Sequence, residues 1–176
     1  MVASREWWEG FFRGPWLRYQ LSKDDPDLVL PAVDFLEAVL DLSPGESVLD
    51  APCGDGRLGR EFARRGYRVT GLDSTAAFLK AGKRKARAQG VDMDWVQGDM
   101  RRLRWRNRFH LLLCWWTSFG FFDDGENRRQ IRAAARALKP GGVLALDLHC
   151  PETLFPGFAR RDWPERGRGT ADTARP

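Results

Sequence analysis

The sequence contains no apolar run of about eighteen residues, the length that a membrane-spanning helix needs. Its N-terminus places Glu6 and Glu9 among aromatic residues and lacks the charged, then apolar, then small-residue order of a signal peptide. Only three cysteines occur, Cys53, Cys114 and Cys150, and their wide separation provides neither a disulfide framework nor metal-ligand spacing. These absences predict a cytoplasmic protein with reduced thiols, no membrane span and no metal site.

Lysine is also scarce, because only five of the 29 basic residues are lysines. The net charge of +5 is modest for 176 residues and is typical of a soluble domain, so it does not by itself indicate an anionic partner. Hydrophobic residues make up 43% and charged residues 30% of the chain, which excludes a disordered or fibrous protein. The length is that of one globular domain.

Short apolar runs alternate with segments of helical spacing. The runs are residues 48–50, 68–72, 93–96, 111–114 and 143–146, and each is typical of a strand buried on both faces. Helical periodicity or capping residues mark segments 33–40, 58–62, 74–90 and 131–138, and each segment ends near glycine or proline. This alternation predicts an α/β, doubly wound, mostly parallel sheet with a Rossmann-like fold.

The turn after the first predicted strand carries the most specific motif. Residues 54–59 read Gly-Asp-Gly-Arg-Leu-Gly, which literally matches the fingerprint that presents backbone amides to a dinucleotide pyrophosphate. However, Asp50 precedes this turn and Asp55 lies inside it, and both carboxylates would repel an anion. The turn therefore favours a cationic ligand, and a nicotinamide-dependent oxidoreductase is the alternative.

Two further carboxylates follow the next two predicted strands. Asp73 ends the second strand, where it could accept hydrogen bonds from ribose hydroxyls. Asp99 and Met100 follow the third strand and would suit an exocyclic amine and a ring face. Because the carboxyl ends of parallel strands meet at one edge of a sheet, we expect Asp50, Asp73 and Asp99 to form one site.

Over residues 28–149 the sequence resembles the class I S-adenosylmethionine-dependent methyltransferases, within a bacterial subgroup of small-molecule or unassigned acceptors. The matching segments occur in the family's order: residues 43–50, 53–57, 66–73, 98–101 and 138–142, with a Thr-Ser-Phe-Gly-Phe-Phe-Asp-Asp run at 117–124. The resemblance implies methyl transfer from S-adenosyl-L-methionine. The chain lacks the Asn/Asp-Pro-Pro-aromatic run of nucleobase amine methylases, which favours a small-molecule acceptor over nucleic acid.

The resemblance also implies a role for each matching residue. The cofactor's amino acid moiety would lie on the turn that includes Cys53, Gly54 and Gly56, with Asp50 near its amino group. Ribose and adenine would be held by four residues at the next two strand ends, namely Asp73, Ser74, Asp99 and Met100. Aromatic faces can also favour a cationic cofactor, and the candidates for this role are Trp16, Tyr19, Trp115 and Trp116.

Methyl transfer is an in-line displacement that depends mainly on orientation and water exclusion. Trp116 and Thr117, after the fourth predicted strand, are candidates to orient the acceptor. If the acceptor needs a base, His149 lies at the ligand-facing end of the fifth strand, whereas His110 lies at the opposite end and is expected to be structural. A module that binds the cofactor without turnover is a further alternative.

The segment 101–108 contains five arginines around Trp105, a pattern that would suit a nucleic-acid backbone and a stacked base. Its position between two strands favours a solvated loop instead.

Three regions are predicted: an aromatic N-terminal cap segment at 1–24, an S-adenosylmethionine-binding domain at 25–150 and an irregular tail at 151–176. The tail contains Pro151, Pro156, Pro164 and Pro176 and has no alternating apolar pattern near its end. The resembling family completes its sheet with a further helix and strands, for which this tail is short. We therefore expect a sheet truncated after the fifth strand, with an exposed edge that the tail or a homodimer partner covers.

Overall fold

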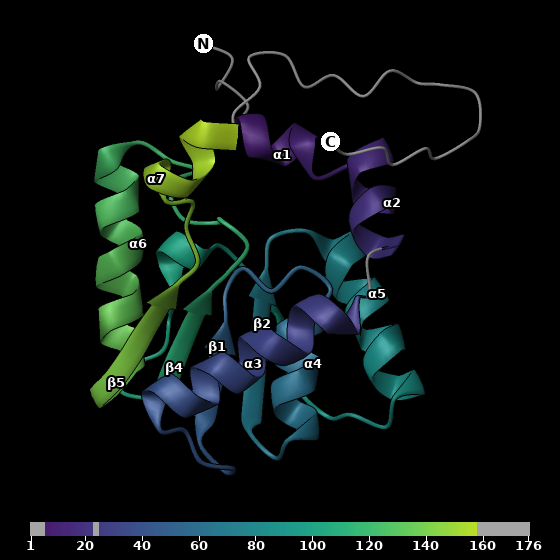
Figure 1. Cartoon of the computed structure of the whole chain (residues 1–176), viewed down its shortest axis with the longest axis vertical. Helices are drawn as coiled ribbons and strands as arrows, with labels where there is room; N and C mark the ends of the chain where they lie inside the picture. The colour runs from purple at the N-terminus through teal and green to yellow at the C-terminus, as the bar shows by residue number, and fades with distance from the viewer. Residues whose placement is uncertain (1–5, 23–24, 158–176) are drawn as a thin grey trace.

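The computed structural model describes residues 6–22 and 25–157, which form a single parallel sheet with helices on both faces (Figure 1). The strands are β1 (Ser47–Asp50), β2 (Arg68–Asp73), β3 (Asp94–Gln97), β4 (Phe109–Cys114) and β5 (Leu138–Leu146). The helices between them are α3 (Pro26–Leu40), α4 (Arg57–Arg64), α5 (Ala76–Ala88) and α6 (Asp124–Ala137), with the short 3-10 turn η1 (Met100–Arg102). The predicted α/β fold and its five strands are confirmed.

The strand order is β3-β2-β1-β4-β5, and every neighbouring pair is parallel. Val48 of β1 pairs with Val69 on one side and with Leu111 on the other. The chain moves outward from β1 to β3 and then crosses back to β4, so the direction of winding reverses between β1 and β4. In open α/β sheets, the carboxyl ends of the strands at such a reversal form the ligand crevice.

Alternate residues of the central strands build two cores, one on each face of the sheet. Val48 and Leu111 lie in the cluster that α3 and α4 cover, whereas Leu49 and Leu112 lie in the cluster that α6 and η1 cover. This is the period-two alternation of strands that are buried on both faces. It explains why these strands appear in the sequence as continuous apolar runs.

The boundary between α6 and β5 differs from the sequence prediction. Leu138 was expected to end the fourth helix, but α6 ends at Ala137 and Leu138 already pairs with Phe109 at the start of β5. Gly141, which has a positive φ of 78°, lies within the register irregularity between these paired residues and the next pair, Leu111 and Val143. The Pro-Gly-Gly punctuation therefore lies inside the strand rather than between two elements.

The N-terminal region forms α1 (Trp7–Phe11) and α2 (Gly14–Ser22), and the chain after β5 forms α7 (Pro151–Leu154) and η2 (Phe155–Gly157). Figure 1 shows α1, α2 and α7 at the end of the sheet toward which the strand arrows point. No strand in the described ranges pairs with the outer edge of β5. The rest of the predicted tail, residues 158–176, lies outside the described residues.

Across residues 6–22 and 25–157, no helix has the length and apolar character that crossing a bilayer requires.

Candidate functional site

A cavity of about 400 Å³ lies beyond the carboxyl ends of β1, β2 and β4 and beneath α1 and α2. Its volume is in the range of small-molecule sites, which are about 300–1,000 Å³. Nine predicted site residues line it, namely Asp50, Cys53, Gly54, Asp73, Ser74, Asp99, Met100, Trp116 and Thr117. The fold thus brings together residues that are separated by up to 67 positions in the sequence.

Asp73 fixes the glycine turn at the base of the cavity. Its two carboxylate oxygens accept hydrogen bonds from the backbone N–H of Gly54 at 2.8 Å and of Thr75 at 2.7 Å. Burial raises the pKa of Asp73, although these hydrogen bonds oppose the shift. Gly54 has a φ of 56°, a left-handed conformation that glycine adopts without strain. Asp73 therefore positions the turn in addition to lining the cavity.

Asp50 is the most deeply buried carboxylate of the site, with 3% of the residue exposed. Burial raises its pKa from the ordinary value of 3.8 to about 7, against the stabilising hydrogen bond from the Gly59 backbone. The nearby carboxylates Asp73 and Asp55 raise it further. A cationic group in the cavity would relieve this unfavourable burial of negative charge.

The contacts of Asp55 change the electrostatic interpretation of the glycine turn that the sequence suggested. Its Oδ2 accepts a hydrogen bond from Lys85 Nζ at 2.7 Å, and Arg57 Nε lies 3.6 Å from its Oδ1. These two cations compensate the Asp55 charge, so Asp55 is a weaker barrier to an anion than its place between two glycines suggested. The acidic character of the site depends mainly on Asp50 and Asp73.

Arg101 connects Asp99 to three other parts of the structure. It forms a bidentate ion pair with Asp99, with N–O distances of 2.7 to 3.1 Å, and a second ion pair with Glu126 of α6 at 3.0 Å. Its guanidinium carbon lies 4.2 Å from the ring centroid of Phe122 and 5.7 Å from that of Trp8. Although burial opposes it, the Arg101 hydrogen bonds hold the pKa of Asp99 below its usual value. The predicted solvated loop therefore contains one buried, structural arginine.

Replacing Arg101 with glutamine should lower the free energy of unfolding by about 2 kcal/mol, because it leaves Asp99 and Glu126 without their shared cation. Lysine should restore less than half of the loss, since it provides neither a bidentate pair nor a stacking plane. Urea unfolding of both variants measures this. The matched control is Arg106→Gln in the same segment, where the side chain is exposed and little change is expected. Full recovery of stability in Arg101→Lys would contradict the role of Arg101 as a bidentate, stacked cation.

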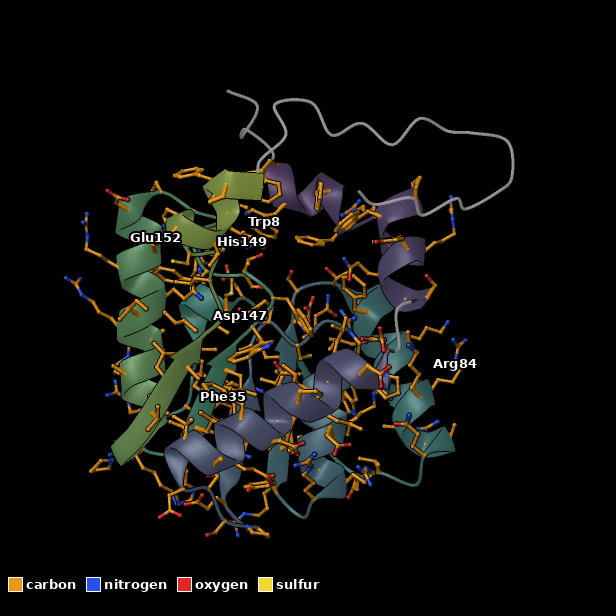
Figure 2. The ribbon with its side chains drawn as sticks, viewed as in Figure 1. Trp8, Phe35, Arg84, Asp147, His149 and Glu152 are labelled. Carbon is orange, nitrogen blue, oxygen red and sulfur yellow. The ribbon has the colours of Figure 1, made fainter. Side chains whose placement is uncertain are left out.

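The loop after β4 presents Trp116 and Thr117 to the cavity. Both residues have positive φ values, 56° and 53°, which are unfavourable for non-glycine residues. The β5 end holds this conformation, because Trp116 N–H donates to the Asp147 carboxylate at 3.0 Å and Thr117 N–H donates to the Asp147 carbonyl at 3.1 Å. Figure 2 shows Asp147 at this strand end. Backbone strain of this kind is concentrated at functional sites.

Four predicted site residues lie outside the cavity lining. Gly56 supports packing instead, because a Cβ at this position would lie 2.5 Å from the Trp95 ring. Trp115 packs against the core cluster beneath α3, and Tyr19 is 47% exposed beside Trp16. His149 is exposed on the connection between β5 and α7 (Figure 2).

His110 was expected to be structural, and its contacts confirm this. At the amino-terminal end of the sheet its Nδ1 accepts a hydrogen bond from Ser47 N–H at 2.9 Å, and its Nε2 lies 3.1 Å from Lys139 Nζ.

Residues that the sequence reasoning missed form the upper wall of the cavity. They are Trp7, Trp8, Phe11 and Phe12 from the N-terminal region and Phe78, Phe121 and Phe122 from elsewhere in the fold. The density of aromatic residues before position 20 was the available signal, but only Trp16 and Tyr19 were considered as ligand contacts. Trp16 does line the cavity.

Comparison with known proteins agrees with the fold. The family model described as a methyltransferase domain matches residues 48–142, which include β1 to β4 and the start of β5. A solved structure described as a TehB-like SAM-dependent methyltransferase from Corynebacterium glutamicum superposes with a TM-score of 0.55 and 25% identity. This match covers 62% of the present chain and 60% of the other.

Two curated relatives are similar in sequence. A 2-phytyl-1,4-naphtoquinone methyltransferase of Synechocystis sp. is 36% identical over 128 residues, 68% of this chain and 52% of the relative. A ubiquinone biosynthesis O-methyltransferase of Erwinia tasmaniensis is 34% identical over 102 residues, 57% of this chain and 41% of the relative. The chain thus spans about half the length of the curated relatives it matches.

Proposed function

Since the chain belongs to the methyltransferase domain family, we propose that it binds S-adenosyl-L-methionine and transfers the methyl group to a small-molecule acceptor. One observation carries the proposal: three carboxylates from three strand ends, Asp50, Asp73 and Asp99, line a single cavity. This arrangement lies next to the reversal in strand order, where α/β folds bind their ligands.

The residues present fit this cofactor. The buried Asp50 would pair with the ammonium of the methionine moiety, which would favour its ionised form. Asp73 already accepts two backbone hydrogen bonds, and its oxygens retain lone pairs for ribose hydroxyls. Asp99 would accept from the adenine amine while Met100 contacts the ring. The proposed contacts assigned to Gly56, Trp115 and Tyr19 have less support, because these residues lie outside the lining.

The cofactor supplies an activated methyl group on a positively charged sulfur. In the transfer, an electron pair of the acceptor forms a bond to the methyl carbon, the carbon–sulfur bond breaks, and its electron pair stays on sulfur. The protein's contribution is to align the two reactants and exclude water. We propose that Trp116 and Thr117 align the acceptor, since the strained loop that carries them is fixed against the cavity. A role for His149 would need a movement of the exposed connection before α7.

The nicotinamide-dependent oxidoreductase is less well supported. Its pyrophosphate would require free amides in the glycine turn, but Gly54 N–H donates to Asp73. The buried Asp50 beneath the turn would also repel a pyrophosphate. A non-catalytic cofactor-binding module stays as the second alternative, because the chain spans about half of its curated relatives.

Two measurements test the proposal. Calorimetric titration of the folded protein with S-adenosylmethionine should give a dissociation constant in the micromolar range, whereas NADH fluorescence should not change on addition of the protein. Incubation with methyl-deuterated cofactor and a small-molecule cell extract should then label a compound by mass spectrometry, and the Asp73→Ala variant is the control. Absence of cofactor binding would refute the proposal. Binding without any labelled product would favour the non-catalytic module.

We further propose a cytoplasmic location. We also propose a small-molecule rather than a nucleic-acid partner, since Arg101, the first arginine of the arginine-rich segment, is buried. The outer edge of β5 is a proposed contact for the tail or for a second copy of the chain.

A further inference from the structure

The cavity has two chemically different halves. The half at the strand ends contains the carboxylates described above, whereas the opposite half is lined almost entirely by aromatic rings. These rings belong to α1, to the residue that follows it and to the loop after β4, and they are Trp7, Trp8, Phe11, Phe12, Phe121 and Phe122. We refer to these six residues as the aromatic chamber.

Contacts between α1 and the loop after β4 fix the walls of the aromatic chamber. The rings of Trp7 and Phe121 meet edge to face with centroids 5.2 Å apart, and Trp7 Nε1 donates a hydrogen bond to the Phe121 carbonyl at 3.2 Å. Trp8 and Phe122 are perpendicular at 6.0 Å, and Arg101 lies over the Phe122 ring. Figure 2 labels Trp8, whose side chain lies below the α1 helix in this view. Rings that are held in this way present fixed faces and edges to a ligand.

The chemistry of the aromatic chamber defines what it can accept. Among the described lining residues of α1 and α2, none is charged. Arg101, which lies over the Phe122 ring, is already paired with Asp99 and Glu126, and the lining residue Arg57 lies beside Asp55. An ionised ligand would therefore lose its hydration with little compensation. Within the described ranges, the indole N–H groups of Trp8 and Trp16 are buried and have no hydrogen-bond partner. Such donors are rarely left unpaired in proteins.

We propose that the aromatic chamber is the acceptor subsite and that it selects a neutral, flat, unsaturated ring system. This inference rests on the proposed function and specifies the class of its acceptor. A flat aromatic ring stacks on aromatic rings or meets them edge to face at centroid distances of about 4.5–7 Å, whereas a puckered saturated ring is thicker and has no π-system to pair with theirs. The subsite lies opposite the strand-end carboxylates, so an acceptor there would face the cofactor.

Calorimetric titration with matched probes tests the inference. The probes are 2-naphthol, which is flat and neutral, decahydro-2-naphthol, which has the same carbon skeleton but is puckered, and 2-naphthoate, which is flat and charged. We expect the protein saturated with S-adenosylhomocysteine to bind 2-naphthol at least tenfold more tightly than either of the others. Because the saturated compound has the larger apolar surface of the two alcohols, apolar burial alone predicts that it binds at least as tightly as 2-naphthol.

Two variants test where on the protein 2-naphthol binds. Phe121→Leu should weaken 2-naphthol binding about tenfold and change the affinity for S-adenosylhomocysteine less than threefold, because the Phe121 ring contacts Trp7 and Phe12 of the chamber. The control is Phe35→Leu on the outer surface of α3, where the ring is 57% exposed (Figure 2). Equal affinity for the flat and puckered probes, or an equal loss in the two variants, would overturn the subsite while leaving cofactor binding intact. Failure to bind S-adenosylhomocysteine would overturn the proposed function and this inference together.

Discussion

Replacing Asp73 with alanine is expected to weaken S-adenosylmethionine binding at least 100-fold. The substitution removes the carboxylate that we assign to the ribose hydroxyls. It also leaves the N–H groups of Gly54 and Thr75 without the acceptor that holds them at 2.8 and 2.7 Å. Hydrogen bonds to a charged group contribute about 1.5–3 kcal/mol each, and a tenfold change in affinity corresponds to about 1.4 kcal/mol. Loss of the ribose contacts and loosening of the turn together account for the expected factor.

Calorimetric titration of three variants separates these effects. Asp73→Asn keeps one oxygen acceptor at the same position and should lose less affinity than Asp73→Ala. Asp94→Ala removes an exposed carboxylate at the opposite end of the sheet, and its cofactor affinity should equal that of the unmodified protein. If Asp73→Ala binds the cofactor within tenfold of the unmodified protein, Asp73 does not hold the ribose.

The strands and the acidic residues of the site could be predicted because both depend on local patterns. Runs such as 111–114 are apolar throughout, which is the requirement for a strand covered on both faces. Once those strands are parallel, their carboxyl ends must share an edge, and the convergence of Asp50, Asp73 and Asp99 follows from topology alone.

Other features depend on tertiary packing that no local pattern encodes. Gly56 has a positive φ and was expected to approach a ligand, yet the neighbour that excludes a side chain there is Trp95 of β3. Arg101 looks like its exposed neighbours in the sequence, and its burial depends on Glu126 of α6 and on the Phe122 and Trp8 rings, which no local pattern places beside it. The aromatic chamber likewise forms only when α1 meets a loop that lies more than 100 residues later.

Replacing Asp50 with asparagine is expected to stabilise the protein near neutral pH and to weaken its binding of S-adenosylmethionine. Burial raises the pKa of Asp50 from 3.8 to about 7, so the folded protein binds this proton more tightly than the unfolded chain does. The resulting stabilisation is complete below pH 4 and is lost as the pH rises toward 7. Above pH 7 the folded state carries a buried charge whose cost, at about 1.4 kcal/mol for each pH unit between the two pKa values, approaches about 4 kcal/mol.

Asparagine does not titrate and can still accept the hydrogen bond from the Gly59 amide, so the variant should avoid this cost. Urea unfolding at pH 5 and pH 8 should give a difference in stability, variant minus unmodified protein, that increases by about 2–3 kcal/mol between the two. At pH 7 the same variant should bind S-adenosylmethionine about tenfold more weakly, because the cofactor's ammonium loses its charged partner. Simple structural damage would lower both quantities, so the opposite signs distinguish a functional carboxylate from a packing residue. A stability difference that is independent of pH would show that Asp50 keeps an ordinary pKa in the folded protein.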